Sequence, residues 1–298
     1  MGDNKHKVQG DTHYNSAILV ILYNKEIKES KTLSTLADCQ FDWGNDKLVI
    51  WNNGPKLLGN RTDALSFNFS LEVEVVETIE NRSLSSIYNS FIANNCSERY
   101  VLLDDDTAIA PSYLNSINKV NFESGGVPII AHGGIRQEPV INGKVFRGEP
   151  FESVTSMVTI TGIGSGLVLG AGLLKTIEKK YKTVFDERFI LYGVDATFFH
   201  RVNAMYLADR FDVLPILNHS LSRLENESNE VTTFRVIERA NAHALILKFY
   251  KSPYMAWKTA LLYSFKYFVK RVFRIEDDLH QKHFIRAFLK GKHYRDKR

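Results

Sequence analysis

The chain has 298 residues, of which 44% are hydrophobic and 24% charged, and it contains only two cysteines. This composition excludes a disordered, collagen-like or disulfide-stapled chain, and the length suits a large α/β domain. The polar first sixteen residues argue against a secretory signal, and the apolar run at 17–23 is far short of the roughly 20 residues that span a membrane. With so few cysteines, we expect a cytoplasmic protein.

The net charge of +4 is unevenly distributed along the chain. From residue 248 to the end there are 14 Lys and Arg against 4 Asp and Glu, whereas the remainder has 24 against 30. An acidic body therefore carries a basic tail.

The first hundred residues alternate between strand and helix patterns. Apolar, β-branched runs predict strands at 17–23, 48–51, 73–76 and 100–103. Apolar residues at helical spacing predict one helix around Leu33 and Leu36 and another over 83–94. The order β-α-β-β-α-β indicates an open, mostly parallel sheet with crossover helices.

The second half of the chain has a less regular pattern. A buried strand is predicted at 165–169 with a helix after it, a further helix near Asp195 and a strand at 211–217. The remaining residues are almost wholly helical in pattern. We expect an α/β domain over residues 1–245 and a basic amphipathic helical extension over 246–298.

Three adjacent carboxylates follow the predicted strand 100–103. Asp104, Asp105 and Asp106 repel one another unless a positive charge lies between them. Oxygen ligands at the carboxyl end of a buried strand suit Mn²⁺ or Mg²⁺ bound to a substrate phosphate. The alternative is a solvated turn in which Asp106 caps a helix that starts near Pro111. The P-loop, dinucleotide and nucleophile-elbow motifs are absent from the sequence, so any phosphate would be handled by a metal.

The order of these segments resembles a known family. The first strand, Trp51-Asn52-Asn53-Gly54, Asn81, the segment 100–106 and the segment 185–195 together look like an inverting glycosyltransferase of family 2 with the GT-A fold. Among its members, rhamnosyltransferase-like enzymes of bacterial surface-polysaccharide assembly are the most similar. The resemblance covers about residues 15 to 245.

The resemblance implies a role for each matching residue. Asp104 and Asp106 match the D-x-D motif, with Asp104 near the donor ribose and Asp106 on a divalent metal, Mn²⁺ or Mg²⁺. Asp195 matches the general base that deprotonates the acceptor hydroxyl, although Val194 stands where the family has Glu. His219 resembles a late metal ligand. The implied donor-binding residues are Asn52, which replaces a frequent Asp, together with Asn81, Asp104 and Asp105.

Each of these residues also has a purely structural interpretation. Asp195 at a helix start can act as an N-terminal cap, His219 at a strand end can be an ordinary structural histidine, and Asn81 can cap a helix. The aromatic and cationic stretch from Trp257 to Arg274 either lies on an anionic membrane or packs on the catalytic domain or a second subunit. The acidic body argues against nucleic acid as a partner.

The sequence therefore predicts a metal-dependent inverting hexosyltransferase. It would move a sugar from a nucleotide-diphosphate donor to a glycan or lipid-linked glycan acceptor in the synthesis of a bacterial polysaccharide such as O-antigen or capsule. The alternatives are a sugar-nucleotide nucleotidyltransferase, or a non-catalytic scaffold that binds nucleotides or glycans.

Overall fold

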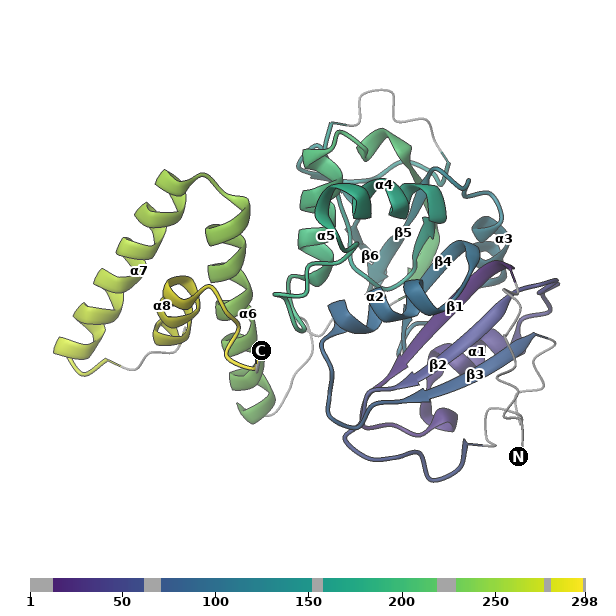
Figure 1. The fold of residues 1–298 in the computed structure, drawn as a ribbon, viewed down its shortest axis with the longest axis horizontal. Helices are drawn as coiled ribbons and strands as arrows, with labels where there is room; N and C mark the ends of the chain where they lie inside the picture. The colour runs from purple at the N-terminus through teal and green to yellow at the C-terminus, as the bar shows by residue number, and fades with distance from the viewer. Residues whose placement is uncertain (1–12, 62–70, 152–157, 219–228, 276–279, 297–298) are drawn as a thin grey trace, which may run out of the picture.

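The computed structural model describes residues 13–61, 71–151, 158–218, 229–275 and 280–296. Its centre is an eight-stranded mixed sheet in the order β11-β5-β10-β4-β1-β2-β3, with β6 paired to β5. Helices cover both faces of this sheet, and the three C-terminal helices are grouped at one side of the molecule (Figure 1). The fold class is the expected one, α/β with a C-terminal helical extension.

Four parallel strands form one half of the sheet. They are β1 (Tyr14–Leu22), β2 (Lys47–Asn52), β3 (Glu72–Glu77) and β4 (Ser97–Asp104). β1 pairs with both β2 and β4, and β2 pairs with β3, all in parallel register. The carboxyl ends of the four strands therefore meet at one edge of the sheet.

The other half of the sheet contains antiparallel pairs. Its strands are β5 (Gly125–His132), β6 (Ile135–Glu138), β10 (Leu167–Gly170) and β11 (Phe211–Asn218). β10 runs antiparallel between β4 and β5, whereas β11 is parallel to β5. A small separate sheet comprises β7 (Val140–Ile141), β8 (Lys144–Val145) and β9 (Ile160–Thr161).

Side-chain alternation along the strands builds a separate core on each face of the sheet. One face packs against α2 (Leu84–Asn94), α4 (Ala171–Tyr181) and α5 (Val194–Ala204). The opposite face packs against α1 (Lys31–Asp38) and α3 (Pro111–Ile117). Strands covered on both faces read as continuous apolar runs, which is why β1, β2 and β4 could be found in the sequence.

The structure corrects details of the predicted elements. The strand predicted at 165–169 begins two residues later, at Leu167, because Gly164 to Gly166 form a turn. The short strands β6 to β9 had no recognisable pattern in the sequence. The domain division at residues 245 and 246 stays a prediction; the helix α6 (Asn229–Tyr250) runs through this position.

The C-terminal helices α6, α7 (Pro253–Val272) and α8 (Gln281–Lys290) share a small core of their own, which includes Phe284 and Phe288. Within the described parts of the chain, no helix combines the length and the apolar character needed to cross a membrane.

A buried carboxylate joins α6 to the sheet domain. Asp186 is 3% exposed, and its side chain accepts hydrogen bonds from Arg188 (Nε to Oδ1, 2.9 Å) and from the Tyr250 hydroxyl at 2.7 Å. Arg201 adds an ion pair at 3.5 Å. Burial alone would raise the pKa of Asp186, but the hydrogen bonds from Arg188 and Tyr250 outweigh it and hold the pKa below its ordinary value.

We predict that Asp186→Ala lowers the free energy of unfolding by about 3 kcal/mol at pH 7, because it leaves Arg201 buried without its carboxylate. Since the folded-state pKa is depressed, the stabilisation by Asp186 is present above the ordinary aspartate pKa of about 4 and is lost as the pH falls below it. Urea denaturation across pH should therefore show the two proteins converging under acidic conditions. The exposed residue Asp209 provides a control, because Asp209→Ala should change the stability by less than about 0.5 kcal/mol. Equal losses in the two variants would contradict this role of Asp186.

Candidate active site

A pocket of about 160 Å³ lies at the carboxyl ends of the parallel strands, and we call it the strand-end pocket. Its polar lining residues are Tyr23, Asn53, Asn81, Arg82 and Arg295. Ile21 also lines the pocket and pairs with Asp104 in the register of β1 and β4. The backbone of this lining residue is therefore one strand spacing, roughly 5 Å, from the backbone of Asp104.

Hydrogen bonds made by Asn53 and Asn81 shape the wall of the strand-end pocket. The Asn53 amide accepts from the Arg82 backbone N–H at 2.9 Å and donates to the Arg82 carbonyl at 2.9 Å. Asn81 adopts a left-handed backbone conformation, with φ of 52°, and its Nδ2 lies 3.4 Å from the Tyr23 hydroxyl. The predicted donor-binding residue Asn81 therefore lies in the pocket, although its contact with a donor stays a prediction.

Asn52, another predicted donor-binding residue, is buried at the end of β2. Its Nδ2 donates to Glu77 Oε2 and to the Lys56 carbonyl, both at 2.8 Å, and its Oδ1 accepts from the Gly54 N–H at 3.0 Å. These bonds hold the turn that presents Asn53 to the pocket. A direct contact between Asn52 and a nucleotide base stays a prediction.

The three carboxylates after β4 have different surroundings. Asp105 forms a 2.8 Å ion pair with Lys25, and burial raises its pKa although Lys25 opposes the shift. Asp106 does not cap α3, since that helix begins after Ala110 and has no side-chain cap. The capping alternative for Asp106 is therefore wrong.

A buried threonine holds the backbone of the acidic turn. The Thr32 hydroxyl donates to the carbonyls of Asp104 and Thr107 and accepts from the Thr107 N–H. The Ser165 hydroxyl accepts from the Asp104 N–H at 3.1 Å. The N-terminal turn of α1 and the loop before β10 thus fix the backbone on which the carboxylates stand.

Asp195 occupies the first turn of α5. Gly193, with φ of 84°, is the N-cap residue, and the Asp195 side chain accepts from the adjacent Ala196 N–H at 2.7 Å. Asp195 is therefore not the capping residue. Burial raises the pKa of its half-buried carboxyl, and the backbone N–H groups of Ala196 and Gly164 only partly offset this shift. A carboxylate with a raised pKa is suited to accept a proton.

Asp104 and Asp195, 91 positions apart in the sequence, lie around one buried tyrosine. The Tyr88 side chain is 4% exposed, and burial together with the charges of Asp104 and Asp195 raises its pKa well above the ordinary value. Tyr88 therefore stays protonated and is positioned between the end of β4 and the start of α5. The roles of Asp104 in donor binding and of Asp195 in catalysis stay predictions.

The metal site has to be judged from its donor atoms. In the described part of the chain, no three His, Cys, Asp or Glu side chains form a group that could hold a metal. His219 lies outside the described residues. The carboxylates of Asp104 and Asp106 are hard oxygen ligands, and Mg²⁺ commonly needs only one or two of them when phosphate oxygens supply the rest. This donor set fits a cation shared with a diphosphate.

Three residues of the site were missed in the sequence. Tyr88 lies on the apolar stripe of α2 and was indistinguishable from a core residue. Arg82 had no motif around it. Arg295 lies 214 positions from its neighbour Asn81, so no local pattern could connect the two.

Comparison with solved structures supports the fold at low sequence identity. The structure of residues 1–349 of S. aureus TarS in complex with UDP-GlcNAc matches with a TM-score of 0.50 and 14% identity, over 92% of this chain and 79% of that chain. A longer S. aureus TarS structure matches at 0.47 and 16% identity, over 84% of this chain but only 42% of that chain. A mycobacterial protein matches at 0.49 and 11% identity, over 78% and 74% of the two chains.

No protein-family model and no curated protein matches the sequence. The mixed sheet with flanking helices is the fold that this chain shares with the S. aureus TarS structure with UDP-GlcNAc, a GT-A-like fold.

Proposed function

We propose that this protein is an inverting, metal-dependent glycosyltransferase that moves a sugar from a nucleoside-diphosphate donor to a hydroxyl group of a glycan or lipid-linked glycan. The observation that carries the proposal is the strand-end pocket, which lies at the carboxyl ends of the parallel strands and is lined by Ile21, the register partner of Asp104. Two arginines among the lining residues suit the charged part of a nucleotide, and the raised pKa of Asp195 suits a proton acceptor. The rhamnosyltransferase-like character and the bacterial polysaccharide pathway belong to the same proposal.

The proposed reaction is a direct displacement at the anomeric carbon. Asp195 accepts the proton of the acceptor hydroxyl while the hydroxyl oxygen attacks the anomeric carbon. The bond between the anomeric carbon and the donor phosphate breaks at the same time. The electron pair leaves with the nucleoside diphosphate. Asp106, with His219 as the other predicted ligand, would hold a Mn²⁺ or Mg²⁺ ion that supplies positive charge to the departing diphosphate, and Asp104 would lie near the donor ribose.

The structure favours glycosyl transfer over nucleotidyl transfer. A nucleotidyltransferase usually binds phosphates with a glycine-rich loop and a basic residue directly after the first strand. Here Tyr23-Asn24-Lys25-Glu26 follows β1 without a glycine, and Lys25 is engaged with Asp105 at 2.8 Å.

One helix of the extension favours action at an anionic membrane surface. Only Ala256 and Ala260 of α7 are buried. An apolar stripe is exposed at helical spacing, with Trp257 at 55%, Leu261 at 65%, Phe265 at 65% and Phe268 at 63%. This stripe does not pack on the sheet domain, which removes one of the alternatives. Four basic residues accompany the stripe on α7: Lys258, Lys266, Lys270 and Arg271. We propose anionic lipid as the occupant of this face.

We expect the protein to bind a nucleoside diphosphate in the presence of Mn²⁺, and we expect Asp106→Ala to abolish the metal-dependent part of that affinity. Isothermal titration calorimetry with uridine, thymidine, guanosine and cytidine diphosphates, each with and without Mn²⁺, measures both effects. Asp42→Ala removes an exposed carboxylate elsewhere and should leave binding unchanged. The proposed donor class would be wrong if none of the four nucleotides bound the wild-type protein. Full metal-dependent affinity in Asp106→Ala would place the metal elsewhere.

Asp195→Asn should lower the transfer rate by roughly 100-fold or more while donor affinity changes less than about threefold, because the amide cannot accept the proton. In the wild type, the rate should rise with pH through a pKa above the ordinary aspartate value, since only the deprotonated carboxylate acts as base. Product formation at saturating donor measures both. A variant rate within twofold of the wild type would remove Asp195 from the base role.

Phe265→Ser combined with Phe268→Ser should abolish co-sedimentation with vesicles rich in phosphatidylglycerol, and added salt should weaken the binding of the wild type. Tyr206→Ser, at a residue 85% exposed on the sheet domain, is the matched control and should bind like the wild type. Absence of wild-type binding at low salt, with a stable dimer in solution, would assign the apolar stripe to a second subunit instead.

A further inference from the structure

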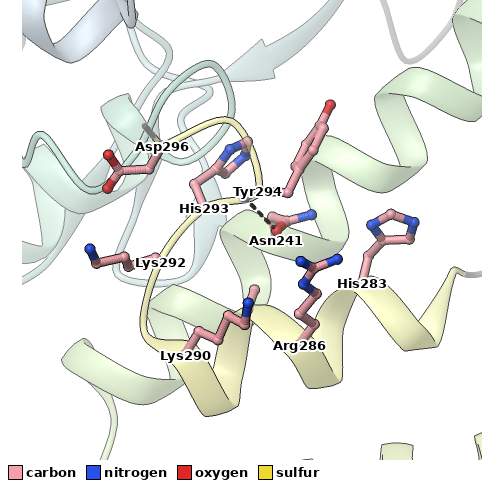
Figure 2. Close-up of a pocket in the computed structure, with 9 residues that line it drawn as sticks. Asn241, His283, Arg286, Lys290, Lys292, His293, Tyr294 and Asp296 are labelled. Atoms are coloured by element: carbon pink, nitrogen blue, oxygen red, sulfur yellow. Dashed lines mark hydrogen bonds between the residues drawn. The ribbon is translucent and has the colours of Figure 1, made fainter. Parts of the chain in front are cut away.

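The chain returns to the sheet domain after its last helix. Residues 291–296, which we call the C-terminal tail, follow α8 and run back along α6 (Figure 2). Gly291 ends α8 in a left-handed conformation with φ of 67°, which redirects the backbone. The Tyr294 N–H lies 3.3 Å from Asn241 Oδ1 on α6 (Figure 2). The tail is therefore docked on α6 by specific contacts.

A buried carboxylate on α6 anchors the C-terminal tail. Glu238 has no exposed surface, and its two oxygens lie 3.5 Å from His293 Nε2 and 3.6 Å from Arg295 Nη1. Burial alone would raise the pKa of Glu238, but the His293 and Tyr294 side chains and the charge of Arg295 lower it overall. A charged carboxylate at this depth is costly without cations beside it, so it holds the tail residues in place.

This anchoring directs Arg295 to the strand-end pocket. Its Nη2 donates to the Asn81 carbonyl at 3.4 Å, and its guanidinium lies 5.9 Å from the centre of the Phe234 ring. The side chain is 21% exposed and lines the pocket together with Tyr23 and Arg82. One end of the guanidinium faces Glu238, and the other end donates to the carbonyl of Asn81, which also lines the pocket.

The pocket has the charge of an anion site. Arg82 and Arg295 both line it, and no Asp or Glu is among the described residues that do so. Arg82 is itself fixed, with its Nη2 3.3 Å from Ser90 Oγ and its guanidinium 5.8 Å from the Trp51 ring. Guanidinium groups bind phosphate oxygens through paired, charge-assisted hydrogen bonds.

We propose that Arg295 is a donor-binding residue that contacts a phosphate of the nucleoside diphosphate, so that the C-terminal tail completes the donor site. Glu238 acts as the positioning residue that holds Arg295 at the pocket. This inference rests on the proposed function, because it takes the donor to be a nucleoside diphosphate. It also gives the helical extension a direct part in donor binding, beyond contact with a membrane.

Calorimetric titration of the full-length protein with Mn²⁺ and the best-binding nucleoside diphosphate tests the proposal. Arg295→Ala should weaken nucleoside-diphosphate binding about tenfold or more, whereas the affinity for the corresponding nucleoside should change less than twofold. Arg286→Ala is the matched control, because Arg286 is also a basic residue of the helical extension. It lines the pocket shown in Figure 2 and not the strand-end pocket. That control should bind both ligands like the wild type.

Thermal melting of each variant reports folding. If Arg295→Ala does not fold, binding is measured with Arg295→Lys. This variant keeps a positive charge toward Glu238 but loses the paired hydrogen bonds. We then expect a loss of at least threefold for the diphosphate only. If the wild type binds the diphosphate and the Arg295 variant binds it with the same affinity, the inference is overturned and the proposed function stands. An equal loss for the nucleoside would also overturn it, and failure of the wild type to bind any nucleoside diphosphate would remove the proposed function itself.

Discussion

The site depends on the parallel register of four strands. Because β1 lies between β2 and β4 and runs parallel to both, the segments that follow these strands are forced to one edge of the sheet. β3 adds a fourth loop to this edge, which carries Asn81 and Arg82. The strand-end pocket and the acidic turn are therefore neighbours for a topological reason, independent of any single side-chain contact.

At this edge of the sheet, the carboxylates of Asp104, Asp105 and Asp195 have different expected roles because their surroundings differ. Asp105 is neutralised by Lys25 and secures the acidic turn to the loop after β1. The charges of Asp104 and Asp195 both act on the buried Tyr88, and burial raises the pKa of Asp195. Hydrogen bonds from Thr32 hold the backbone of the acidic turn at Asp104 and Thr107. The position of the turn therefore does not depend on the carboxylate side chains alone.

The parts of the fold that were predicted are those with strong local signals. β1, β2 and β4 are buried on both faces and read as apolar runs, and α2 and α4 show clear helical spacing. β6 to β9 are too short for a pattern, and the antiparallel insertion of β10 between β4 and β5 is set by long-range pairing. In the site, the acidic turn was visible in the sequence. Arg295 was not, because only the packing of the C-terminal helices brings it to Asn81.

The helical extension thus has two faces with different expected partners. The exposed apolar stripe of α7 suits an anionic lipid surface, while the C-terminal tail after α8 reaches the strand-end pocket. The buried network of Asp186, Arg201 and Tyr250 ties α6 to the sheet domain and so fixes the base on which the tail is docked.

A crystal structure of the protein with a bound nucleoside diphosphate and Mn²⁺ tests the central claim most directly. We expect the nucleotide in the strand-end pocket, with the metal on Asp106 and a phosphate oxygen within hydrogen-bonding distance of Arg295. An ordered nucleotide bound away from the carboxyl ends of β1 to β4 would contradict the account.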